Sequence, residues 1–174
     1  DLFLPYERGA GSLYSLEHFR TVASRLNEGG VFVQWLPLYQ LTEQEFGVIA
    51  RTMLEAFGEV TMWRNNFQPG QEKVALMGRN ISSPVRILPS GKNEAMLAAV
   101  DGLGWQETYP DMFRVAAESM PFLYAGNLTA AADLFRDYPL NTDDHPVIEY
   151  QTPKNFRELA ASDKLIWCIG PHLT

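Results

Sequence analysis

The chain has 174 residues, a length typical of one domain, and its 46% hydrophobic and 12% aromatic content is enough for a substantial core. Its 21 acidic and 14 basic residues give a net charge of −7, which argues against nucleic-acid binding and against docking on anionic lipid. One cysteine excludes a disulfide framework and a multi-cysteine zinc site. No apolar run approaches a membrane span and no signal peptide opens the chain, so we expect a cytoplasmic protein.

The chain opens with an acid, three apolar residues and a proline at residues 1–5, a pattern typical of the end of a buried strand. Because a domain rarely begins inside a strand, we expect an N-terminal part to precede Asp1. A glycine-containing loop follows at residues 6–12. Apolar residues at helical spacing then predict a helix from residue 13 or 15 to residue 27, ended by a pair of glycines.

A nearly continuous apolar run predicts a strand over residues 31–36 that is covered on both faces, as in a parallel sheet. The clearest local pattern is the capping box formed by Thr42 and Glu45, flanked by Leu41 and Phe46 as a hydrophobic staple. It predicts that a helix begins there, and an apolar stripe at helical spacing extends that helix to residue 57.

Two further strands are predicted over residues 60–63 and 73–78, close enough in sequence to form an antiparallel hairpin. The alternation of strands and helices up to residue 78 predicts an α/β fold with a parallel sheet, and the hairpin would supply an antiparallel edge.

Beyond residue 79 the sequence contains many turn-forming residues and predicts mainly helices. The predicted helices cover residues 92–100, 111–119, 128–136 and 153–161, with a polar loop at 141–146 and a short strand at 147–150. We therefore expect two parts, an α/β half-domain over residues 1–79 and a mainly helical C-terminal extension over residues 80–174 that packs on it.

Ligands of an open α/β sheet bind beyond the carboxyl ends of its strands, which here are the loops at residues 1–12, 34–41 and 64–72. Gln34 is the only polar side chain in its strand, so it is either a structural residue with satisfied hydrogen bonds or a residue that faces a ligand. The chain has no G-x-G-x-x-G, no Walker A and no G-x-S-x-G sequence, which disfavours an α/β-hydrolase. A nucleoside-binding glycine turn would therefore have to precede Asp1.

The run Asp143-Asp144-His145 contains metal-ligand residue types, but three consecutive residues seldom point at one ion. We expect no metal there, and instead a loop whose carboxylates cap or pair with nearby backbone.

Several stretches form one recognisable pattern: DLFLP at residues 1–5, GSLYS at 11–15, EHF at 17–19, GG at 29–30, QWLPLYQL at 34–41 and NTDDHPVIEY at 141–150. Together they resemble the second half of the nucleotide-binding domain of spermidine synthase-like proteins, the polyamine aminopropyltransferases. The last stretch resembles the TDD-x-P-x-x-E-[FY] tail of a bacterial branch that is often fused to membrane segments.

The resemblance implies a class I methyltransferase-like, Rossmann-type sheet and a metal-free transfer of an aminopropyl group to an amine. Decarboxylated S-adenosylmethionine, or S-adenosylmethionine itself, would be the co-substrate. By this resemblance Asp1 would be catalytic, helping to deprotonate the attacking amine. Substrate-binding positions would be Leu4, Gln34, Phe67 and Gln68, and cofactor-binding positions would be Pro5, Gly11 and Leu13.

Two positions depart from the family pattern. Leu4 stands where typical members have a second carboxylate for the diamine, and Phe67 replaces a tyrosine. Both changes make the acceptor pocket more apolar, so putrescine recognition is disfavoured. Two hypotheses stay open: a transferase with an altered acceptor pocket, and a degenerate, non-catalytic transferase fold that acts as a binding or assembly module. A homo-oligomer also stays open, and any membrane attachment would come from segments outside this chain.

Overall fold

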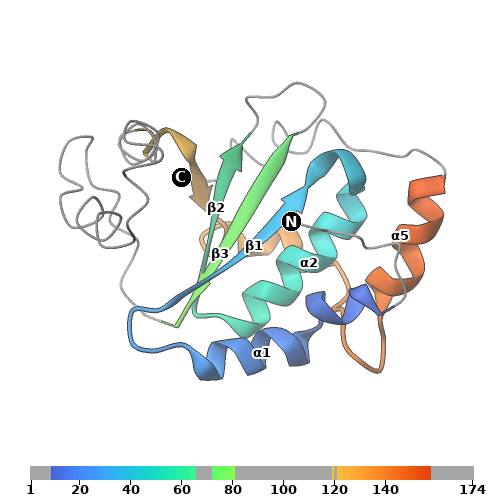
Figure 1. The fold of residues 1–174 in the computed structure, drawn as a ribbon, viewed down its shortest axis with the longest axis horizontal. Coiled ribbons are helices and arrows are strands. Elements are labelled where there is room, and N and C mark those ends of the chain that lie inside the picture. Colours follow the sequence, from blue (N-terminus) through green and yellow to red (C-terminus); the bar gives the residue numbers. More distant parts are fainter. Residues whose placement is uncertain (1–8, 66–71, 81–118, 120, 158–174) are drawn as a thin grey trace, which may run out of the picture. The chain divides into compact units, whose positions relative to one another are not determined.

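The computed structural model describes residues 9–65, 72–80, 119 and 121–157 (Figure 1). Two compact units divide the chain, residues 1–83 with 125–174, and residues 84–124. The first unit contains almost all described elements. They are η1 (Ala10–Tyr14), α1 (Leu16–Arg25), β1 (Val31–Pro37), η2 (Leu38–Gln40), α2 (Glu43–Ala56), β2 (Glu59–Asn65), β3 (Lys73–Arg79), β4 (Tyr124–Asn127), η4 (Ala132–Phe135) and α5 (Val147–Arg157).

The four strands form one sheet in the order β1-β3-β2-β4. β3 pairs antiparallel with β1 and with β2, so that Met77 stands opposite Val33 on one side and Thr61 on the other. The predicted antiparallel pairing of β2 with β3 is confirmed. The predicted edge position is wrong, because β3 lies between β1 and β2. Since β1 and β2 both oppose β3, they run in the same direction but do not pair with each other, so the parallel pairing that was predicted for these strands is wrong.

The predicted strand at residues 31–36 is confirmed, but its predicted burial on both faces is wrong. Val31, Val33 and Trp35 are 48%, 38% and 45% exposed, whereas Leu36 is fully buried. β1 is also the end of the strand order among the described residues. An uninterrupted apolar run fixes the extended backbone, but it does not fix which face of the strand is covered.

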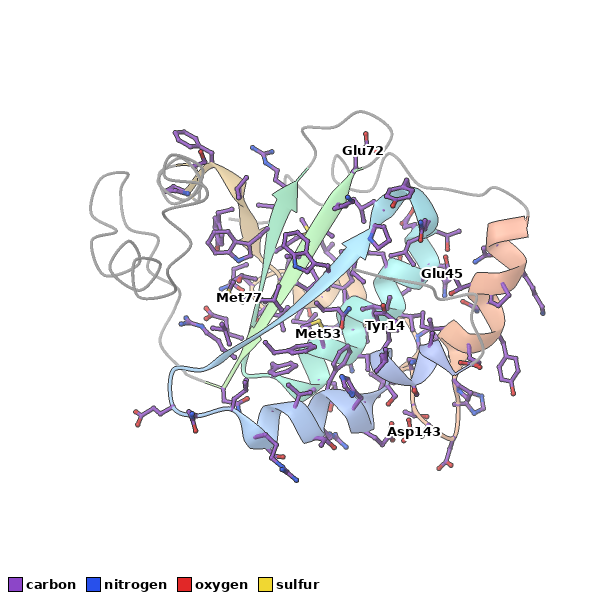
Figure 2. All side chains as sticks on the ribbon, viewed as in Figure 1. Tyr14, Glu45, Met53, Glu72, Met77 and Asp143 are labelled. Carbon is purple, nitrogen blue, oxygen red and sulfur yellow. The ribbon has the colours of Figure 1, made fainter. Side chains whose placement is uncertain are left out.

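Helices α1 and α2 cover one face of the sheet (Figure 1). Phe19 of α1 packs against Phe32 of β1 and against Phe57, with ring centroids 5.9 and 6.3 Å away. Met53 of α2 is fully buried in the same core (Figure 2). Large apolar side chains from both helices therefore anchor this face of the sheet.

Helix α2 confirms the prediction made from the capping box. Thr42 accepts a hydrogen bond from the Glu45 amide at 3.3 Å, and the Glu45 carboxylate accepts one from the Thr42 amide at 2.7 Å. Leu41 and Phe46, the predicted staple, are both buried. Two orphan amides of the first turn are thus satisfied reciprocally, which fixes the start of the helix.

The C-terminal part differs from the prediction in three places. The segment at 147–150 is not a strand but the first turn of α5, because Ile148 and Thr152 bury at helical spacing behind Pro146. The predicted helix at 128–136 is a turn followed by the short η4. β4 was not predicted and extends the sheet beside β2, where the Leu128 amide donates to the Val60 carbonyl at 2.9 Å.

Other predicted elements fall on residues that the structure does not describe. The helix at 92–100 lies outside the described residues, and so does that at 111–119 apart from Ser119. Of the helix predicted at 153–161, the described part belongs to α5, which contains Pro153.

Candidate functional site

A short loop precedes α1 and carries two of the predicted site residues. It begins at Gly9, whose positive φ of 88° places it in the left-handed region that glycine adopts without cost. The 3-10 helix η1 follows, and the Ser12 hydroxyl donates to the Gly9 carbonyl at 2.8 Å. The left-handed residue followed by helical residues turns successive backbone amides toward one point, a geometry that binds anions.

The anion at that point is the carboxylate of Glu149. Its Oε1 accepts a hydrogen bond from the Gly9 amide at 2.6 Å, and its Oε2 accepts one from the Gly11 amide at 3.1 Å. Glu149 lies in the first turn of α5, where the helix dipole also favours a negative charge. Bonds of this charge-assisted kind are stronger than neutral ones, so the carboxylate is an effective tether for the loop.

Asn141 makes the second contact between this loop and residues 141–157, which we call the tail, and its side chain is completely buried. Its Nδ2 donates to the Gly11 carbonyl at 3.0 Å, and its Oδ1 accepts from the Ile148 amide at 3.1 Å. Its backbone amide donates to the Thr52 hydroxyl at 3.0 Å, and its carbonyl accepts from the Leu16 amide at 2.8 Å. One side chain therefore links the loop directly to the start of α5.

Gly11 has no room for a side chain. A Cβ added there would lie 2.8 Å from Oε2, 2.9 Å from Cβ and 2.9 Å from the amide nitrogen of Glu149. Backbone atoms cannot yield as a flexible side chain can, so only glycine allows this close approach. We call Gly9 to Ser12, with Asn141 and Glu149, the loop clamp.

The polar loop of the tail, residues 142–146, also contacts α1. Glu17 accepts a hydrogen bond from the Asp143 amide at 3.0 Å, and Figure 2 shows Asp143 on the loop that leads into α5. The Thr142 hydroxyl accepts from the His145 amide at 3.0 Å, which closes a turn. Asp143 and Asp144 are exposed. The predicted loop is confirmed, but the carboxylates that hold backbone amides here belong to Glu17 and Glu149.

The predicted site residues are only partly described. Gly11 is buried in the loop clamp, and Leu13 on η1 is 52% exposed. Gln34 is half-buried on β1, and its Nε2 lies 3.3 Å from the Trp35 carbonyl. No described hydrogen bond joins it to the loop. The other predicted site residues lie outside the described residues: Asp1, Leu4, Pro5, Phe67 and Gln68.

A separate polar contact, outside the loop clamp, joins α2 to α5. Glu45 is completely buried, and Figure 2 shows it between these two helices. Its Oε2 accepts from Thr42, whose hydroxyl also lies 3.4 Å from Asn155 Nδ2. Its Oε1 has no hydrogen-bond partner in the described structure, and neither has Thr152 Oγ1. The Glu45 carboxylate completes the N-terminal cap of α2 and is covered by α5. The Thr42–Glu45 sequence pattern predicts the cap but not this burial.

One buried tyrosine beside the loop clamp has a shifted pKa. Burial raises the pKa of the Tyr14 hydroxyl at the end of η1, so that side chain stays neutral at physiological pH. In the described part of the chain no group of three or more His, Cys, Asp or Glu side chains could hold a metal ion. None of the described helices is long and apolar enough to cross a membrane.

Asn141 and Glu149 are functional candidates that the sequence did not predict, although both belong to the motif at residues 141–150. The available indication was compositional: an amide begins the polar loop at residues 141–146, and a carboxylate stands shortly after it, directly behind Ile148. Their partners in the loop, Gly9 and Gly11, lie 130 to 140 positions earlier in the chain, so no local pattern could pair them.

Compared with known proteins, the chain matches no family model, no curated protein and no solved structure.

Proposed function

We propose that this chain is the acceptor-side part of a spermidine synthase-like transferase, which moves an aminopropyl or related group from a sulfonium nucleoside to an amine. The observation that carries the proposal is the loop clamp. The two regions that resemble the family, residues 1–78 and 139–153, are distant in sequence, and their described parts meet at Gly11. That is the loop to which the resemblance assigns cofactor contacts.

The arrangement of the sheet is compatible with this proposal. α2 connects β1 to β2, which run in the same direction, as a helix does in a strand-helix-strand crossover. In such folds ligands bind beyond the carboxyl ends of the parallel strands. We further propose that residues 1–79 belong to a Rossmann-type, class I methyltransferase-like domain.

The proposed chemistry needs few groups. The amine nitrogen attacks the methylene carbon bonded to the sulfonium sulfur, the carbon–sulfur bond breaks, and the electron pair stays on sulfur in the neutral methylthioadenosine. A protonated amine cannot attack, so a carboxylate takes its proton, a role that the resemblance assigns to Asp1. No metal is required.

The acceptor that we propose is less charged or more apolar than putrescine. A dication entering a pocket that has Leu4 in place of a carboxylate loses a charge partner, and its desolvation is poorly compensated. We expect slow or absent turnover of putrescine, and Leu4→Asp should shift the preference toward putrescine. Aminopropyl transfer measured across a panel of amines, wild type against Leu4→Asp, tests this. Fast wild-type turnover of putrescine would contradict the proposed acceptor.

The presence of Leu4 in place of a carboxylate also motivates the second candidate function, a non-catalytic transferase fold that serves as a binding or assembly module. Calorimetry of the full-length protein separates the two. The transferase should release heat on titration with decarboxylated S-adenosylmethionine, S-adenosylmethionine or methylthioadenosine. The absence of heat with all three would favour the module.

A further inference from the structure

We infer that Glu149 is a positioning residue for the nucleoside cofactor, acting through the backbone of Gly9 and Gly11 on the loop that carries Leu13. The inference rests on the proposed function, since it assigns this loop to cofactor binding. Glu149 itself need not touch the cofactor.

The loop has little of its own to fix its conformation. Its own contacts reach only three residues along the chain: the Ser12 hydroxyl and amide donate to the Gly9 carbonyl at 2.8 and 3.4 Å, the Ser15 amide donates to the Ser12 carbonyl at 3.1 Å, and no side chain caps η1. Gly9 is exposed and in the left-handed region, and glycine loses more conformational freedom on ordering than any other residue. A helix of five residues is also too short to be stable alone. The conformation of the loop therefore depends on contacts from outside it.

Those contacts come from a rigid support. Glu149 sits between buried Ile148 and the body of α5, and Asn141 holds the Ile148 amide while it also holds the Gly11 carbonyl. The support thus reaches the loop through two amides bound by Glu149 and one carbonyl bound by Asn141. The backbone of Gly11 is held on both its N–H and its C=O.

Such a support matters for ligand binding because a displacement of about 1 Å is enough to spoil a binding site. Leu13 stands two residues after Gly11 and is half-exposed, so its position follows that of the loop. If the loop is released, the cofactor must order it again on binding, which weakens affinity. A residue that served fold stability alone would change the melting temperature and leave the affinity of the folded protein unaltered.

The test is the Kd of methylthioadenosine and of decarboxylated S-adenosylmethionine for the full-length protein, measured by calorimetry at a temperature where every variant is folded. Glu149→Gln keeps the shape of the side chain, but its amide nitrogen cannot accept from an N–H. We expect the Kd to rise about tenfold in Glu149→Gln, as for the loss of one charge-assisted hydrogen bond, and further in Glu149→Ala.

Glu17→Gln is the matched control, because Glu17 also binds a backbone amide across the tail loop but does not touch Gly9 or Gly11. We expect its Kd to equal that of the wild type. An unchanged Kd in Glu149→Gln, with a wild type that binds, overturns this inference alone. A wild type that binds neither ligand overturns the proposed function, and the inference with it.

A measurement on the wild type remains decisive if Glu149 variants do not fold. Ligand should slow amide hydrogen exchange at residues 9–13, because binding and the clamp stabilise one loop conformation. Exchange at these residues that is unaffected by bound ligand would overturn the inference.

Discussion

Two carboxylates in this molecule bind backbone amides in the same way but across very different stretches of chain. Glu45 accepts from the Thr42 amide at 2.7 Å, three residues away. Glu149 accepts from the Gly9 amide at 2.6 Å, 140 residues away, and from the Gly11 amide. The two contacts use the same groups, but Glu45 is completely buried whereas Glu149 is half-buried, and the sequence distances they span differ greatly.

That difference decides what each contact can do. The capping box forms within one turn of helix, so it fixes a local boundary and is visible as a four-residue pattern. The loop clamp forms only when the rest of the domain brings α5 beside η1, so it depends on the complete tertiary fold. We therefore expect substitutions in the clamp to cost more stability than substitutions in the cap.

The largest effect is expected for Asn141→Ala. It removes two buried side-chain bonds and leaves the Gly11 carbonyl and the Ile148 amide without these partners. We predict a loss of roughly 3 kcal/mol in the free energy of unfolding, measured by urea denaturation. Asn27→Ala, which truncates an exposed asparagine, should change it by less than about 0.5 kcal/mol. A loss below about 1 kcal/mol for Asn141→Ala would show that the clamp contributes no more than a local cap.

Gly11→Ala should come next. The new methyl group would meet the backbone and side chain of Glu149 at 2.8 to 2.9 Å, so the tail must move. We predict a loss of about 2 kcal/mol, the cost typical of overpacking.

The mechanism behind that loss can be tested by a double-mutant cycle. Glu149→Ala removes Oε2 but keeps the Cβ and the amide nitrogen, each 2.9 Å from the added methyl group, so most of the cost of Gly11→Ala should persist in a Glu149→Ala background. A cost that vanished in that background would show that Gly11→Ala acts by displacing the carboxylate alone.

These two contacts also show where the sequence was informative. α2 was predicted together with its first residue, because Thr42, Glu45 and the apolar stripe lie within one segment. The pairing of β2 with β3 was predicted from their closeness in the chain, but the insertion of β3 beside β1 was not, since pairing partners are set by the whole sheet.

The tail was harder to predict because its local pattern was ambiguous. Residues 147–150 contain two β-branched side chains and a tyrosine, which favours a strand when the segment is taken alone. The helix forms because Ile148 and Thr152, four residues apart, both bury in the core, and because Glu149 in the first turn binds the loop. Tertiary contacts here outweigh the weak local preference.

Thr42→Ala should have a smaller effect than either clamp substitution. It removes the hydroxyl that accepts from the Glu45 amide, and we predict a loss of about 1 kcal/mol. Thr21→Ala is the control, since that hydroxyl only donates to the Glu17 carbonyl in an exposed part of α1. An unchanged urea midpoint in Thr42→Ala would contradict the energetic role of the cap, and a loss above that of Gly11→Ala would reverse the expected order.

The smallest effect concerns His18, where the tail meets α1 through charge. Desolvation beside Phe19 and Phe32 lowers the pKa of His18 below its usual value, and the negative charge of Asp143 partly opposes this shift. The unfolded chain therefore binds this proton more readily than the folded one. Its contribution to stability is present above about pH 6.5 and is lost as the pH falls through the lowered pKa of the folded state.

Two measurements sharpen this last point. An NMR titration should give His18 a pKa below 6.5, the usual histidine value, and Asp143→Asn should lower it further by removing the opposing charge. In His18→Gln the corresponding loss of stability below about pH 6.5 should disappear. If Asp143→Asn instead left the His18 pKa unchanged, the tail would meet α1 through the hydrogen bonds at Glu17 and Leu16, and the long-range contact would be one of backbone tethering rather than of charge.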